Sequence, residues 1–160
     1  MASPTLALAQ AETPQWFVSR AAQDGMLEVA LGKLASARSQ NPEVARFANR
    51  MVAVHAEANA TLEALAIAKG LKVPTRLDAE HQSMIEFFKD KSGDEFDAAY
   101  MLHIATANAK TMALFGRASR LNDVGLATFA KRTLAIVREH AQPAQSMRAS
   151  AGKSVATSSL

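Results

Sequence analysis

The sequence has no cysteine and few of the residues that interrupt helices. Its 160 residues include 7 glycines, 5 prolines and only 6% aromatic residues. The absence of cysteine excludes disulfides and thiolate metal ligands. Alanine is very common, whereas β-branched and aromatic residues are sparse, and this mixture favours helices over strands. Because no segment alternates convincingly between apolar and polar residues, the sequence predicts an all-α fold.

The sequence also lacks long apolar runs and dense basic clusters. A membrane-spanning helix needs a run of about 18 apolar residues, and none follows the N-terminal segment. The net charge is +3, although residues 110–160 hold 8 Lys or Arg against only Asp123 and Glu139. These basic residues are spread along predicted helices, whereas nucleic-acid surfaces carry clustered Lys and Arg with stacking aromatics. We therefore expect no transmembrane segment and no nucleic-acid binding.

Residues 1–13, MASPTLALAQAET, differ from the rest of the chain. Residues 6–11 combine apolar residues with alanines at the A-x-A spacing of a signal-peptide cleavage site, and cleavage after Ala9 or after Ala11 fits that spacing. The alternative is a disordered, alanine-rich tail. We interpret the segment as the remnant of a signal peptide, which predicts a periplasmic or otherwise exported protein.

Residues 14–148 form one predicted domain of long helices. Thr13-Pro14 and Asn41-Pro42 each place a capping side chain before a proline that suits the first helical turn. Gly70 is the expected stop of the second helix. The predicted helices span, in chain order, 14–39, 42–69, 94–119 and 123–146.

The lengths of the connections predict how these helices are arranged. Short loops join the first pair and the last pair, whereas residues 71–92 form a long connection in which 76–89 has helical spacing. One long crossover is the ferritin-like arrangement of a four-helix bundle. We therefore predict this bundle, with a short fifth helix in the crossover between helices 2 and 3. Residues 149–160 are predicted to be a disordered tail.

A histidine interrupts the apolar stripe of the second helix. His55 follows Met51 by one turn on the stripe that the core should cover. In the predicted topology, Glu28, Asn108 and His140 reach nearly the same level from the other helices. Such a cluster either satisfies itself by hydrogen bonds, with or without buried water, or binds a metal ion. The candidate metal ligands are Glu28, His55 and His140, with Asn108 as a candidate fourth member, and zinc, iron, copper or nickel would suit them.

Several kinds of chemistry have no motif here. The Glu-x-x-His signature of di-iron bundles is missing, because Val52 and Val137 stand three residues before the two histidines. The chain has no glycine-rich phosphate loop and no serine in a nucleophile motif, so we lean against an enzyme. We expect His81 to lie at the surface of the crossover, and His103 to lie at a boundary or exposed position.

Three segments carry a resemblance to a known family. They are WFVSRAAQDGMLEVALGKLASARSQNPEVARFANRMVAVHAEANATLEALA, then FDAAYM followed by AKTMALF, and finally TLAIVREHAQPA. In their order and spacing over about residues 14–146, the chain resembles the bacterial ferritin-like family called domain of unknown function 4142. Its members are often labelled exported or outer-membrane proteins. The resemblance therefore implies an exported four-helix bundle whose chemistry is undefined.

The polar residues agree with this family only in part. Glu28, His55 and His140 match its pattern, whereas Val54 and Asn108 stand where members usually carry aspartate and histidine. If the family's polar set binds metal, this chain lacks ligands or their supporting groups. We predict a non-enzymatic protein of the cell envelope, linked to stress only by association with such families. The alternative is a mononuclear metal-binding or metal-dependent redox protein, and a second copy or another envelope protein is the expected partner.

Overall fold

The computed structural model describes residues 13–157, with side chains described through residue 147. Within that range the chain forms helices and no strand. The helices are α2 (Pro14–Arg38), α3 (Pro42–Ala68), α4 (Ala79–Lys89), α5 (Gly93–Ala118) and α6 (Val124–Thr157). The all-α prediction is confirmed, while the predicted signal remnant, apart from Thr13, lies outside the described residues.

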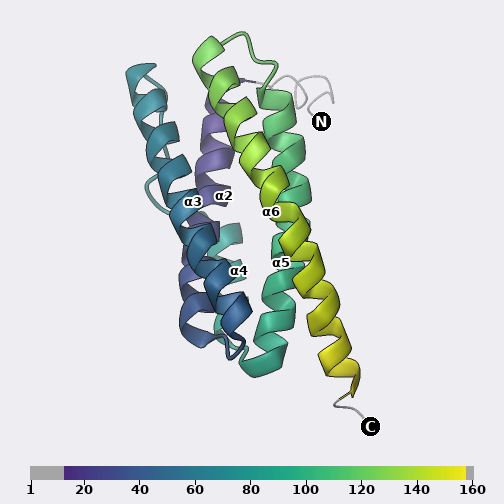
Figure 1. Ribbon diagram of the computed structural model, residues 1–160. Helices are drawn as coiled ribbons and strands as arrows, with labels where there is room; N and C mark the ends of the chain where they lie inside the picture. The colour runs from purple at the N-terminus through teal and green to yellow at the C-terminus, as the bar shows by residue number, and fades with distance from the viewer. Residues whose placement is uncertain (1–12, 158–160) are drawn as a thin grey trace, which may run out of the picture.

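The long helices pack as two antiparallel pairs, α2 with α3 and α5 with α6. The connection from α3 to α5 returns along the bundle, so α3 and α5 run in the same direction, as do α2 and α6 (Figure 1). On its way, this connection places α4 against α2 and α5. The short helix thereby forms part of a wall on one face of the molecule.

The helix starts follow from local capping. The Thr13 hydroxyl accepts a hydrogen bond from the Trp16 backbone N–H at 3.1 Å, and Asn41 does the same for the N–H of Glu43 at 2.9 Å. A proline follows each cap within the first turn, where it has no hydrogen bond to lose. After α3, Gly70 takes φ +68°, a conformation that only glycine adopts without strain. The predicted boundaries at these points are confirmed.

Helix α6 is longer than the sequence pattern predicts. It continues to Thr157, past the expected end near Ser146, so the backbone of 149–157, predicted to be disordered, is helical. Pro143 lies inside it and removes one backbone donor. Alanines at 141 and 144 have the highest helix propensity, and they offset part of that loss.

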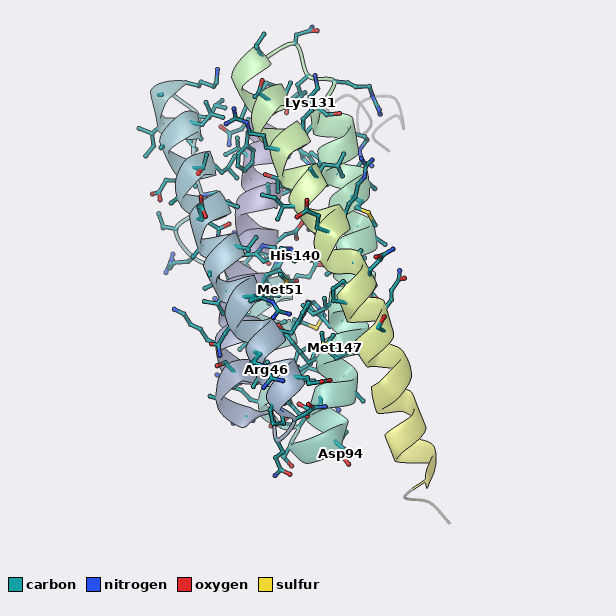
Figure 2. All side chains as sticks on the ribbon, viewed as in Figure 1. Arg46, Met51, Asp94, Lys131, His140 and Met147 are labelled. Atoms are coloured by element: carbon teal, nitrogen blue, oxygen red, sulfur yellow. The ribbon has the colours of Figure 1, made fainter. Side chains whose placement is uncertain are left out.

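The apolar core consists of two clusters separated along the bundle axis. The first includes Leu31, Phe47, Met51, Phe88, Phe96, Tyr100 and Met101. The second includes Phe17, Val18, Leu62, Leu114, Phe115, Leu126 and Phe129. Figure 2 shows His140 at mid-height of the bundle, above Met51 and Met147 of the first cluster. The four polar residues that were predicted to share one level lie between the two clusters; they are Glu28, His55, Asn108 and His140.

Candidate binding site

The centre of the polar layer is a buried pair, Glu28 on α2 and His103 on α5. Glu28 is only 7% exposed, and its Oε1 accepts a hydrogen bond from His103 Nε2 at 2.9 Å. Its other oxygen, Oε2, is buried without a partner among the described residues. Burial alone would raise the pKa of Glu28, but the hydrogen bond and charge of His103 lower it below its ordinary value. Glu28 is therefore a carboxylate at neutral pH.

His103, which hydrogen-bonds to Glu28, is not one of the metal ligands predicted from the sequence. Of the boundary or exposed position expected for His103, the structure shows the boundary one: the residue is partly buried, and 13% of its side chain is exposed beside Glu28. A signal was present in the sequence. His103 lies three residues after Tyr100 and four before Ala107, so it belongs to the inward stripe of that helix.

The structure brings together some of the other predicted site residues. Glu28 and His55 line one small cavity of about 30 Å³, which has room for a water molecule. Burial lowers the pKa of His55 and outweighs the attraction of Glu28, which raises it. Burial is also the main cause that lowers the pKa of His140, and the charge of His55 lowers it further. Both imidazoles are therefore neutral at neutral pH. Asn108 has its Nδ2 buried, but hydrogen-bonds to none of these residues.

No metal-binding group is evident in the described part of the chain. There, no three His, Asp or Glu side chains are grouped so that they could hold a metal ion. His103 hydrogen-bonds to one oxygen of Glu28, which leaves the second oxygen and His55 as the nearest candidate metal ligands. The interpretation of Glu28, His55 and His140 as metal ligands stays a prediction.

A second histidine, His81, ties α4 to α2. It is 3% exposed, with Nδ1 2.6 Å from Asp78 Oδ1 and Nε2 3.0 Å from Asp24 Oδ1. Because both partners are carboxylate oxygens, the ring can satisfy both only when both nitrogens carry hydrogen. Burial lowers the pKa of His81, but the hydrogen bonds to Asp78 and Asp24 outweigh it and raise that pKa above its ordinary value.

The surface position predicted for His81 is therefore wrong. Its acidic neighbours along the sequence suggest a solvated segment, whereas Asp78 caps α4 through the His81 backbone N–H at 3.0 Å. Asp24, which meets the ring from the other side, lies on a different helix. Only the packing of α4 against α2 brings these groups together, and no local pattern encodes it.

Helices α2, α4 and α5 enclose a cleft of about 300 Å³. Its inner part contains Glu28, His103, Asp24 and His81. Its outer part has three apolar side chains in solvent, Met84, Phe87 and Leu102, with exposures of 37%, 52% and 50%. The cleft therefore combines a charged, hydrogen-bonded interior with an apolar entrance.

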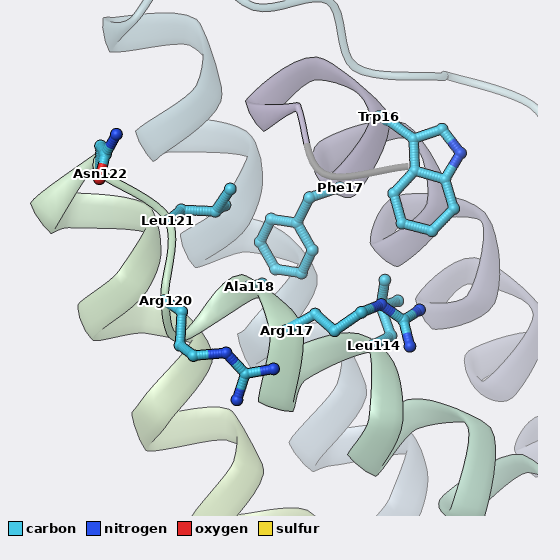
Figure 3. A pocket seen from close by; sticks show the side chains of 8 residues that line it. All are labelled: Trp16, Phe17, Leu114, Arg117, Ala118, Arg120, Leu121 and Asn122. Carbon is cyan, nitrogen blue, oxygen red and sulfur yellow. The ribbon is translucent and has the colours of Figure 1, made fainter. Parts of the chain in front are cut away.

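A second hollow, of about 210 Å³, lies where the start of α2 meets the end of α5. Figure 3 shows Phe17 near its centre, with the Trp16 ring and the Arg117 guanidinium to one side and Arg120 to the other. Among the residues that the structure describes, no acidic one lines it. Its charge is thus opposite in sign to that of the carboxylates inside the larger cleft.

Comparison with known proteins identifies a family. The family model for a domain of unknown function, DUF4142, matches residues 1–147. The chain belongs to the DUF4142 family. No curated protein and no solved structure matches this DUF4142 chain. None of its described helices is long and apolar enough to cross a membrane. Because the family has no assigned activity, the function of this DUF4142 protein must be argued from the site.

The contacts of His81 predict how stability depends on pH. Since its pKa is higher in the folded than in the unfolded protein, its contribution is complete below the unfolded value of 6.5 and is lost as the pH rises through the folded value. We expect the contribution of His81 to the free energy of unfolding, measured in urea from about pH 5 to about pH 9, to decline across that window.

A His81→Gln variant isolates this contribution. His55 and His140 have lowered pKa values, so they act in the opposite direction: their contribution is lost as the pH falls. The difference between wild type and variant removes this background. The expected result is a difference that shrinks with rising pH, and a difference that is constant across the window would contradict the assignment.

Proposed function

We propose that this DUF4142 protein is a non-enzymatic binding protein of the cell envelope, and that its α2–α4–α5 cleft takes a small amphipathic molecule. The observation that carries the proposal is the grouping of Met84, Phe87 and Leu102 around an interior with a few fixed polar groups. Small-molecule sites have this composition: apolar walls for affinity and a few polar groups for orientation. Exposed apolar groups gathered at a concave site, rather than scattered singly, point to a ligand.

The polar groups of the cleft favour binding over catalysis. His103 is engaged by Glu28, and His81 is held between two carboxylates. His81, held in this way with a hydrogen on both ring nitrogens, has no free nitrogen with which to accept a proton. A nucleophilic mechanism would instead need a hydroxyl group within hydrogen-bonding reach of a base. The described hydrogen bonds of the two histidines go to carboxylates only.

A neutral dye tests whether the cleft binds apolar molecules. We expect Nile red to gain fluorescence saturably with the wild-type protein. Leu102→Asp should weaken binding about tenfold or more, because it removes apolar contact from the entrance. The matched control is Ile67→Asp, since Ile67 is 65% exposed on α3 and lies outside the cleft. Equal weakening by the two substitutions, or no saturable binding, would contradict the proposal.

Export and a ferritin-like relationship belong to the same proposal. The A-x-A spacing within residues 6–11 supports export. The two antiparallel pairs, joined by one long connection, support a ferritin-like bundle. Fractionation of cells of the native host, followed by N-terminal sequencing of the protein, tests export. A periplasmic protein that begins at Gln10 or Glu12 is the supporting result, and a protein found only in the cytoplasm is the opposing one.

A transition-metal protein using Glu28, His55 and His140 is the second candidate. It is favoured by the shared cavity of Glu28 and His55 and by the unpartnered Glu28 Oε2. Elemental analysis of protein purified without chelator tests it. Stoichiometric metal that disappears in His55→Ala and His140→Ala would support this candidate, and absence of metal would count against it. Light scattering on the same sample tests self-association.

A further inference from the structure

Charged side chains of both signs line the cleft: Asp24, Glu28 and Glu80 are acidic, whereas Arg20, Lys110 and His81 are basic. Glu28 is a buried carboxylate in the inner wall, and Asp24 is a second one, with a side chain 28% exposed. The two basic side chains of the cleft other than histidine, Arg20 and Lys110, lie toward solvent. A ligand that enters the cleft therefore meets carboxylates at its inner end.

Each of these carboxylates keeps an oxygen available. Asp24 receives both Arg20 Nε at 3.3 Å and His81 Nε2 at 3.0 Å on the same oxygen, Oδ1. Glu28 receives His103 on Oε1, and Oε2 is buried with no partner among the described residues. A buried carboxylate oxygen without a donor is costly, and such an atom calls for a missing partner. Groups that donate hydrogen bonds and carry positive charge would supply it.

The cations at the mouth do not reverse this preference. Arg20 is already engaged by Asp24 and, at 3.8 Å, by Glu80. Lys110 is exposed, so water and salt screen its charge. The charge of Glu28 is buried, where the effective dielectric constant is lower and the interaction with a ligand is stronger. The interior also holds His81, which is paired with Asp24 and Asp78, so the buried carboxylate oxygen without a donor is Glu28 Oε2.

We propose that the cleft binds a primary ammonium ion carried on a short apolar body, with the ammonium group directed at Asp24 and Glu28. The body would lie against Met84, Phe87 and Leu102, whose exposed surfaces are of the right kind to cover it. This inference rests on the proposed function, because it names the class of ligand for the same cleft. It adds that an anionic amphiphile of the same length is excluded.

Three probes with the same chain separate charge from apolar contact: octylammonium, octanol and octanoate. Calorimetric titration of the wild-type protein should give octylammonium an affinity about tenfold to a hundredfold higher than that of octanol, because a hydrogen bond to a charged group is stronger than a neutral one. Octanoate should bind more weakly than octanol at this cleft. It could instead bind at the hollow lined by Arg117 and Arg120, so Arg117→Ala serves to remove that contribution.

Charge variants identify the cleft as the source of the preference. Glu28→Gln should remove most of the preference for octylammonium over octanol, whereas Glu63→Gln on the exposed face of α3 should preserve it. Because Glu28→Gln could disturb folding, Thr106→Lys provides an independent test at an exposed position of the cleft. It should weaken octylammonium but not octanol, and the same substitution at exposed Thr128 on α6 should change neither.

The outcomes separate this inference from the proposed function. If octanol binds as tightly as octylammonium, or octanoate binds best in Arg117→Ala, the ammonium assignment is overturned while the binding cleft stands. If Nile red binds and none of the three probes does, the ammonium assignment is likewise overturned while the binding cleft stands. If neither Nile red nor any probe binds, both proposals fail. A preference that is unchanged in Thr106→Lys would also overturn the ammonium assignment.

Discussion

Replacing His103 with leucine should destabilise the protein by about 3–5 kcal/mol, the usual cost of leaving a buried charge without its partner. The substitution leaves Glu28 buried with neither of its oxygens hydrogen-bonded. The loss of solvation of that carboxylate, rather than the loss of the contact itself, accounts for most of the cost. Urea unfolding at neutral pH, monitored by circular dichroism, measures it.

The same variant should regain stability as the solution becomes acidic. Without His103, burial dominates the pKa of Glu28 and raises it, so the carboxyl group takes up a proton at a higher pH and no longer carries a buried charge. The cost measured at neutral pH should therefore shrink below the raised pKa. A destabilisation independent of pH would show that lost packing, not the orphaned charge, is responsible.

A double variant provides the matched control. Glu28→Leu with His103→Leu replaces both partners of the buried pair by apolar side chains, and such replacements are often neutral or stabilising. We expect the double variant to be more stable than His103→Leu alone by most of the single-variant cost. If the two variants are equally unstable, Glu28 is not the group that His103 stabilises.

The helices were predictable because their boundaries are encoded locally. Thr13 and Asn41 cap the helices that follow them, and Gly70 ends α3. These features depend on the hydrogen-bonding capacity of one side chain or the conformational freedom of one residue, so they can be identified without a structure. The end of α6 was not encoded in this way, because Pro143 is tolerated within the helix.

The site was predictable only where a residue follows the stripe of its own helix. Glu28 and His55 share a cavity because both lie at mid-length on inward stripes. His103 also follows the inward stripe of its helix, but its pairing with Glu28 could not be deduced, because that pairing depends on how α5 rotates against α2. The cleft was even harder to predict from the sequence. It requires α4 to lie across two helices, and His81 meets Asp24 only after that docking.

The polar layer between the two apolar clusters raises the question of whether the ends of the bundle unfold separately. Phe17 tests this at one end. It is 2% exposed, and the centroid of its ring lies 5.2 Å from that of Phe115, in an edge-on arrangement, and 6.5 Å from that of Phe129. Phe17→Ala should cost about 3–5 kcal/mol, since it removes a buried ring and leaves a cavity. Phe87→Ala, the same change at a half-exposed position, should cost less than about 1 kcal/mol.

The shape of the unfolding curve then decides how the clusters are coupled. All four long helices pass through both clusters and the polar layer, so melting one end would expose apolar faces along the helices that hold the other. We therefore expect Phe17→Ala to shift a single transition to lower urea without changing its slope, as two-state unfolding requires. A second transition in that variant would mean that the polar layer uncouples the two ends. In that case Glu28 and His103 would mark a boundary between folding units rather than a bond between them.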